Sequence, residues 1–74
     1  MNKDLMMEIL INDGCTKTGA KQHIELGTVI YTEEDINELE EEFGVTKEQV
    51  ETGNGGDIVA TVYDGVKYYI AYAN

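Results

Sequence analysis

The sequence predicts a single α+β domain, residues 1–74, in which three to four short helices pack on a C-terminal antiparallel β-hairpin. Two patterns favour this fold class. Apolar residues recur at helical spacing through much of residues 3–51, and strand-type residues flank the two-residue turn Asp64-Gly65. Because an isolated hairpin is at best marginally stable in water, we expect one of its faces to pack on the helices.

The first two helices are expected at residues 3–12 and 17–26. Asn2 and Thr16 are their N-cap candidates, because short polar side chains accept hydrogen bonds from the free N–H groups of a first turn. Gly27 supplies the C-terminal stop of the second helix. The apolar stripes comprise Leu5, Met6, Ile9 and Leu10 in the first helix, and Ala20 and Ile24 in the second. The short connection predicts an antiparallel helix pair.

Residues 28–31 are β-branched and aromatic, which leaves a third short strand as an open alternative to an extended connection. The next helix is expected at residues 33–43, where Thr32 and Asp35 resemble a capping box. Its predicted buried stripe comprises Ile36, Leu39 and Phe43.

A second capping box, Thr46 with Gln49, predicts a short helix that ends near Thr52. Residues 53–56 then form a glycine-rich stretch that we expect to be a flexible joint. This stretch is not a phosphate-binding loop, because it leads into a strand and lacks the lysine of such loops.

The hairpin is predicted at residues 57–63 and 66–73, with Tyr63 opposite Val66. Its larger face comprises Val59, Thr61, Tyr63, Val66, Tyr68, Ile70 and Tyr72, and its smaller face Ile58, Ala60, Val62, Lys67, Tyr69 and Ala71. The smaller face is apolar enough to leave two alternatives open, a second covered face or a contact surface. Tyr69 is the candidate for an exposed contact on that face.

The charge balance excludes two classes of partner. Fifteen Asp and Glu residues against five Lys and no Arg give a formal charge of −10. Such a chain is repelled by nucleic acid and by anionic membrane surfaces, so we expect no direct contact with either. A single cysteine, with no signal-like or membrane-length apolar segment, predicts a cytoplasmic protein.

The negative charge is densest between residues 33 and 51, where an inward apolar stripe would leave the carboxylates on the outer face. Three interpretations remain open: a solvated surface that serves solubility, a surface that docks on a basic protein, and a site for a divalent cation. The last lacks EF-hand spacing. The candidate partner-binding residues are Glu34, Glu38, Glu41, Glu42 and Glu48, together with Tyr69.

Cys15 and His23 suggest a nucleophile and its base, but eight residues of helix separate them by roughly 12 Å along the axis. We therefore expect no catalytic pair here, and one Cys with one His falls short of a zinc site. No catalytic residue, metal or cofactor is predicted.

Several short segments together carry a resemblance. They are Gly14-Cys15-Thr16-Lys17, Ala20, His23-Ile24, Gly27-Thr28-Val29-Ile30-Tyr31, Val62-Tyr63, Lys67-Tyr68-Tyr69-Ile70 and Tyr72. With the acidic middle, the chain resembles a family of small uncharacterised acidic proteins encoded by phages and conjugative elements of gut Firmicutes, over most of residues 14–74. The chain departs from that family at Gly19 and in a shorter middle. The resemblance implies no activity, only a mobile-element setting in which short acidic proteins often disable host defence by occupying a nucleic-acid channel.

These observations favour a protein-binding module over an enzyme. The expected partner is a host or element protein with a basic surface, and counter-defence is the role that the resemblance implies. The alternative is a regulatory or assembly protein that self-associates, as a homodimer for example, through the tyrosine-bearing hairpin.

Overall fold

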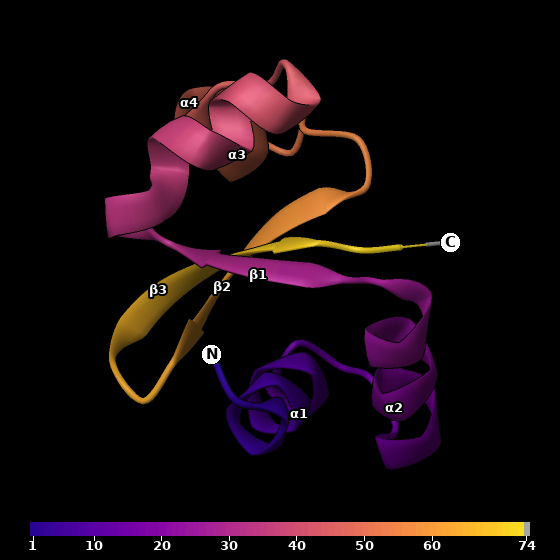
Figure 1. The fold of residues 1–74 in the computed structure, drawn as a ribbon. Coiled ribbons are helices and arrows are strands. Elements are labelled where there is room, and N and C mark those ends of the chain that lie inside the picture. Colours follow the sequence, from indigo (N-terminus) through magenta and orange to yellow (C-terminus); the bar gives the residue numbers. More distant parts are fainter. Residues whose placement is uncertain (74) are drawn as a thin grey trace.

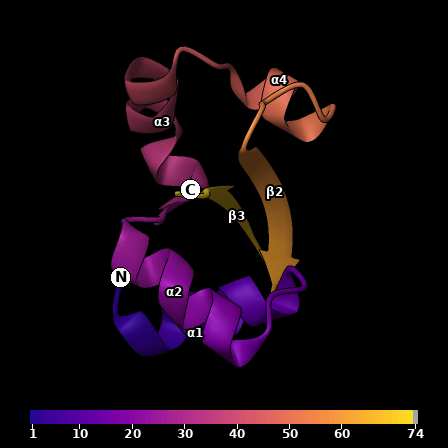
Figure 2. The same cartoon turned by 90° about the vertical axis from the view of Figure 1, so that its right-hand side faces the viewer.

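A three-stranded antiparallel sheet lies between two pairs of helices in the computed structural model, which describes residues 1–73 (Figure 1). The elements are α1 (Lys3–Asn12), α2 (Lys17–Leu26), β1 (Val29–Thr32), the 3₁₀ turn η1 (Glu33–Asp35), α3 (Ile36–Phe43), α4 (Lys47–Glu51), β2 (Ile58–Tyr63) and β3 (Val66–Ala71). In the view of Figure 2, α3 and α4 lie above the sheet, and α1 and α2 lie below it. The predicted α+β class is confirmed.

The predicted limits of α1 and α2 are confirmed, and local hydrogen bonds explain them. The Asn2 side chain accepts a 2.8 Å hydrogen bond from the Leu5 N–H, and the Thr16 hydroxyl accepts one of 3.0 Å from the Gly19 N–H. Each satisfies a first-turn donor that has no partner inside the helix. Gly27 ends α2 at a φ of 102°, a conformation that is strained for residues with a Cβ.

The hairpin has the predicted turn and register. Asp64 and Gly65 both have positive φ, 51° and 75°, as a type I′ turn requires, and Tyr63 lies opposite Val66. The third strand is also confirmed, as β1. It pairs with β3, with Val29 opposite Ala71, so β3 is the central strand.

Both faces of the hairpin are covered, which decides between the two alternatives left open for its smaller face. On the α1/α2 side the buried core comprises Ile9, Leu10, Ala20, Ile30, Tyr68 and Ile70. On the α3/α4 side it comprises Leu39, Val50, Ile58, Tyr69 and Ala71. The smaller face is therefore partly covered: Ile58, Tyr69 and Ala71 are buried in a second core, whereas Val62, nearer the turn, is 57% exposed.

The helix predicted at residues 33–43 ends at the predicted residue, but its first turn and the burial of its last residue differ from the prediction. Residues 33–35 form a 3₁₀ turn, and the Thr32 hydroxyl donates to Asp35 instead of accepting from the backbone, so no capping box forms there. At the other end Phe43 is 44% exposed, although it was expected in the buried stripe. Its ring contacts Tyr31 edge to face, with centroids 6.3 Å apart, at the margin of the core.

The next segment confirms one prediction and corrects another. The Thr46 and Gln49 capping box is complete in α4, with reciprocal hydrogen bonds of 3.1 and 2.8 Å. The glycine-rich joint at 53–56, however, is closely packed at one residue, whereas Gly53, Asn54 and Gly56 are exposed. Gly55 is buried, and a Cβ there would lie 3.0 Å from Val50 Cα and from the Ile58 carbonyl oxygen.

Candidate protein-binding surface

The negative charge of the chain is concentrated on the α3/α4 side of the sheet. Residues 33–51 hold nine carboxylates and one lysine, whereas residues 3–26 hold four carboxylates and three lysines. These two segments lie on opposite sides of the sheet (Figure 1). The fold thus separates a strongly acidic side from one that is close to neutral.

The packing of α3 determines which of its side chains face solvent. Leu39 is fully buried against the sheet and Ile36 is half-buried, so the opposite side of the helix faces outward. All five predicted carboxylates are exposed: Glu34 on η1, Glu38, Glu41 and Glu42 on α3, and Glu48 on α4. We call these five residues the acidic surface.

Other carboxylates of the same segment have structural partners. Glu40 accepts a 2.9 Å hydrogen bond from the Lys47 N–H, which joins the start of α4 to α3. Glu33 lies 4.0 Å from the Lys47 ammonium. Glu51 accepts from the Lys67 ammonium at 2.9 Å. The two lysines closest to the acidic side are therefore engaged with carboxylates outside the acidic surface.

The acidic surface itself is not neutralised from within the molecule. Among residues 1–73, no ion pair involves any of its five carboxylates. The pKa of the Tyr31 hydroxyl is raised, first by burial and then by the negative charges of Glu42, Glu38 and Asp35. The negative potential of this side therefore reaches the sheet. The exposed ring of Phe43 contacts Tyr31, so an apolar group lies within this negative region.

The structure contradicts the prediction that Tyr69 is an exposed contact. Its side chain is fully buried between the sheet and α4, and its hydroxyl donates a 3.0 Å hydrogen bond to Glu51 Oε1. Burial and this hydrogen bond raise the pKa of Tyr69. Tyr68 is also buried, on the other face of the hairpin, whereas Tyr63 and Tyr72 are half-buried.

Sequence reasoning missed a polar cluster around Tyr72. The Tyr72 hydroxyl donates a 2.5 Å hydrogen bond to Asp13 and lies 3.7 Å from Cys15 Sγ, while its ring contacts the His23 ring edge to face at 4.9 Å. Tyr72 thus contacts both Cys15 and His23, the two residues whose types suggest a nucleophile and its base. His23 Nδ1 instead contacts the Ala73 carbonyl at 3.1 Å.

The Tyr72 cluster holds the C-terminal strand against α1 and α2. Burial and the hydrogen bonds with Asp13 and Cys15 raise the pKa of Tyr72, so the phenol stays protonated and remains a donor. Its position could not be predicted from local sequence, because it depends on the pairing of β3 with β1 far along the chain.

Within residues 1–73, no cluster of three or more His, Cys, Asp or Glu side chains is arranged to hold a metal ion. No helix in the described part of the chain is both long and apolar enough to cross a membrane. Comparisons with protein-family models, with curated proteins and with solved structures gave no match.

Proposed function

We propose that the chain is a protein-binding module whose acidic surface docks on a basic protein. The observation that carries this proposal is the set of five exposed carboxylates with no ion-pair partner among residues 1–73. Unpaired like charges on one face repel each other, and a partner rich in Lys and Arg relieves that repulsion on binding. Such complementarity also raises the association rate.

The spacing of the charges supports a partner that normally holds nucleic acid. Residues 33–43 carry seven carboxylates. A 3₁₀ turn and an α-helix of their lengths rise by about 6 and 12 Å, which gives about one charge per 2.6 Å. A single DNA strand has one phosphate per about 3.4 Å. The acidic side thus has at least the linear charge density that a strand-binding groove accommodates.

More specifically, we propose that the chain has a counter-defence role in a mobile element. A protein that fills the nucleic-acid channel of a host defence enzyme needs dense negative charge and few cations, which this side of the sheet has. Phe43 adds an apolar group that an interface can bury, since aromatic side chains in the centre of an interface contribute much of its affinity.

Affinity capture with a triple variant tests the proposal. Glu38→Lys, Glu41→Lys and Glu42→Lys together reverse the centre of the acidic surface while Leu39 keeps its buried contacts. We expect the wild-type chain to capture a Lys- and Arg-rich protein from host lysate at low salt and to lose it at high salt. The triple variant should capture little of it.

A matched pair of variants separates the site from the total charge. Glu41→Gln with Glu42→Gln and, on exposed positions of α2, Thr18→Lys with Gln22→Lys each raise the net charge by the same amount. Only the first pair should weaken capture. If both pairs weaken it equally, or if the captured partner binds the triple variant as well as the wild type, the acidic surface serves solubility alone.

A further inference from the structure

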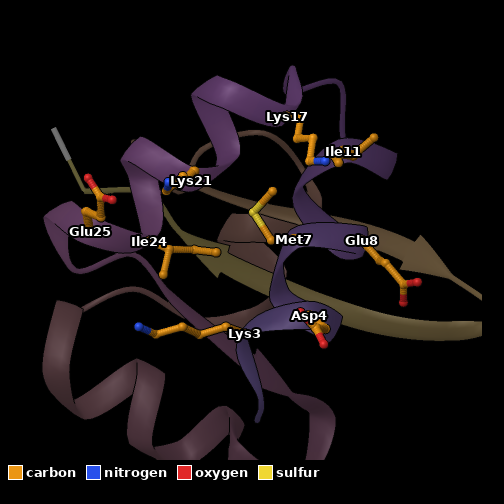
Figure 3. A pocket seen from close by; sticks show the side chains of 9 residues that line it. All are labelled: Lys3, Asp4, Met7, Glu8, Ile11, Lys17, Lys21, Ile24 and Glu25. Carbon is orange, nitrogen blue, oxygen red and sulfur yellow. The ribbon is translucent and has the colours of Figure 1, made fainter.

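A groove separates the outward sides of α1 and α2, on the near-neutral side of the molecule. Its volume is about 600 Å³. Met7 and Ile24 point toward one another across it, and Ile11, which is 44% exposed, extends the apolar floor (Figure 3). An apolar floor between two surface helices is typical of a helix-docking site, and Met adapts its shape to a partner.

The two walls of the groove have opposite charge. Asp4 and Glu8 project from α1, whereas Lys17 and Lys21 project from α2 (Figure 3). The groove therefore has an acidic wall and a basic wall on either side of an apolar floor. A complementary occupant needs an apolar stripe with a basic wall facing α1 and an acidic wall facing α2.

A second copy of this chain has that pattern. We propose that two copies associate face to face through the α1/α2 groove, so that α1 of each copy lies over α2 of the other. The contact is self-complementary, as a twofold dimer requires: each acidic wall meets the basic wall of the other copy, and the four helices surround the apolar side chains of the two floors. The proposal goes beyond partner binding by the acidic surface and does not depend on it.

The charges also select the direction of the twofold axis. A twofold axis parallel to the groove places α1 of one copy over α2 of the other. An axis perpendicular to the groove would instead place the two acidic walls over each other. Lys3 and Glu25 lie at the same end of the groove and carry signs opposite to those of their own walls. Because the sign of the charge is reversed at this end of both walls, the axis along the groove also brings the Lys3 cation of one copy to the Glu25 anion of the other.

The position of the groove allows association despite the net charge of −10. The acidic surface lies on the other side of the sheet from α1 and α2 (Figure 1), so a dimer formed through the groove keeps the two acidic surfaces far apart. It also leaves both of them exposed at opposite ends of the assembly, where one dimer can engage two basic sites.

The contact is small, so the dimer should be weak. Two ten-residue helices about 15 Å long and 10 Å apart offer a patch of roughly 300 Å² per copy, below that of standard interfaces. A dissociation constant on the order of 10⁻⁴ M is expected. Sedimentation equilibrium up to about 1 mM protein covers this range.

Charge-swap variants test the pairing of the walls. Asp4→Lys with Glu8→Lys makes both walls basic, and Lys17→Glu with Lys21→Glu makes both acidic. Each variant alone should self-associate at least about tenfold more weakly than the wild type. A one-to-one mixture should form heterodimers, because in it every basic wall again meets an acidic one.

A chain carrying all four substitutions is the matched control. It keeps the net charge of −10 with the walls exchanged, and it should dimerise like the wild type. Because a hydrogen bond links Glu8 to the Tyr63 hydroxyl, circular dichroism melts must show that each variant is folded. A wild type that stays monomeric at about 1 mM overturns the proposal, as does a mixture of folded variants that fails to associate.

Discussion

The Tyr69 hydroxyl, on the central strand β3, donates a 3.0 Å hydrogen bond to Glu51 Oε1 at the C-terminal end of α4. The same oxygen accepts from the Lys67 ammonium at 2.9 Å. The two donors lie two residues apart on one face of the strand, so a single carboxylate holds α4 against the sheet. Glu51 is therefore a structural carboxylate, like Glu40, in a segment whose remaining acids are exposed.

Replacing Glu51 by Gln should destabilise the fold at neutral pH and change its response to acid. Hydrogen bonds from Lys67 and Tyr69 lower the pKa of Glu51 below its usual value of 4.5. A carboxyl group with a lowered folded-state pKa contributes stability that is complete above its unfolded pKa and is lost as the pH falls through the folded one. The difference in unfolding free energy between wild type and Glu51→Gln should therefore narrow as the pH falls below 4.5, the usual pKa of the carboxyl group.

Glu48→Gln is the control for this prediction, because Glu48 is exposed on the same helix and belongs to no ion pair within residues 1–73. Denaturant unfolding of the three proteins across the acid range makes the comparison. A Glu51→Gln deficit that is independent of pH would show that the carboxylate charge contributes nothing.

Tyr72→Phe should remove a contribution to the free energy of unfolding that the wild type itself loses at alkaline pH. Burial, and then the hydrogen bonds with Asp13 and Cys15, raise the pKa of Tyr72 above its usual value of 10.0. A raised folded-state pKa means that the contribution is complete below about pH 10 and declines as the pH rises above it. Near neutral pH the variant should lose about 1 kcal/mol, the typical net value of one hydrogen bond.

The free energy of unfolding of both proteins, measured at neutral pH and above pH 10, checks this prediction. The deficit of Tyr72→Phe relative to the wild type should shrink in alkali. Tyr69, whose pKa is also raised, is present in both proteins and cancels in the comparison. A deficit that grows with pH would contradict the assignment of the phenol as a donor to Asp13.

Gly55→Ala should cost about 1–3 kcal/mol, the usual range for overpacking a core position. The added methyl group would lie 3.0 Å from Val50 Cα and from the Ile58 carbonyl oxygen, and backbone atoms cannot rotate away. Gly56→Asn is the control. Gly56 has a φ of 66°, a Cβ there would have no other atom within 4 Å, and Asn tolerates such backbone angles. If the two variants melt alike, residue 55 is a loose linker after all.

Local chemistry explains which parts of the fold were predictable. Asn2, Thr16 and Thr46 satisfy helix N–H groups within three residues of themselves, and Asp64-Gly65 determines its own turn, so the limits of these elements follow from short segments. The position of β1 beside β3 depends on residues far apart in the chain, such as Val29 and Ala71, and strand propensity alone does not identify the neighbouring strand.

The same distinction applies to the candidate site. The exposure of Glu38 follows from helical periodicity once Leu39 faces inward, so the acidic surface was predictable. The burial of Tyr69 was not, because periodicity separates the two faces of a strand without saying that helices cover both. Phe43 was misplaced for a related reason: its position at the end of α3 takes it beyond the margin of the second core.

Glu38→Lys should stabilise the fold at low ionic strength. Residue 38 lies one helical turn from Glu42 and four residues from Glu34, so a lysine there replaces two repulsive contacts by attractive ones. The gain should be roughly 0.5 kcal/mol at low salt and should vanish near 1 M salt, where the Debye length is about 3 Å. Thr18→Lys with Gln22→Lys, on exposed positions of α2, raises the net charge by the same two units and is the control for total charge. Thermal melts at both salt concentrations measure the effect. A loss of stability at low salt would mean that the favourable position of the Glu38 carboxylate in the first turn of α3 outweighs its repulsion by the neighbouring acids. The expected gain would show that the native residue lowers stability at the centre of the surface proposed to bind a partner.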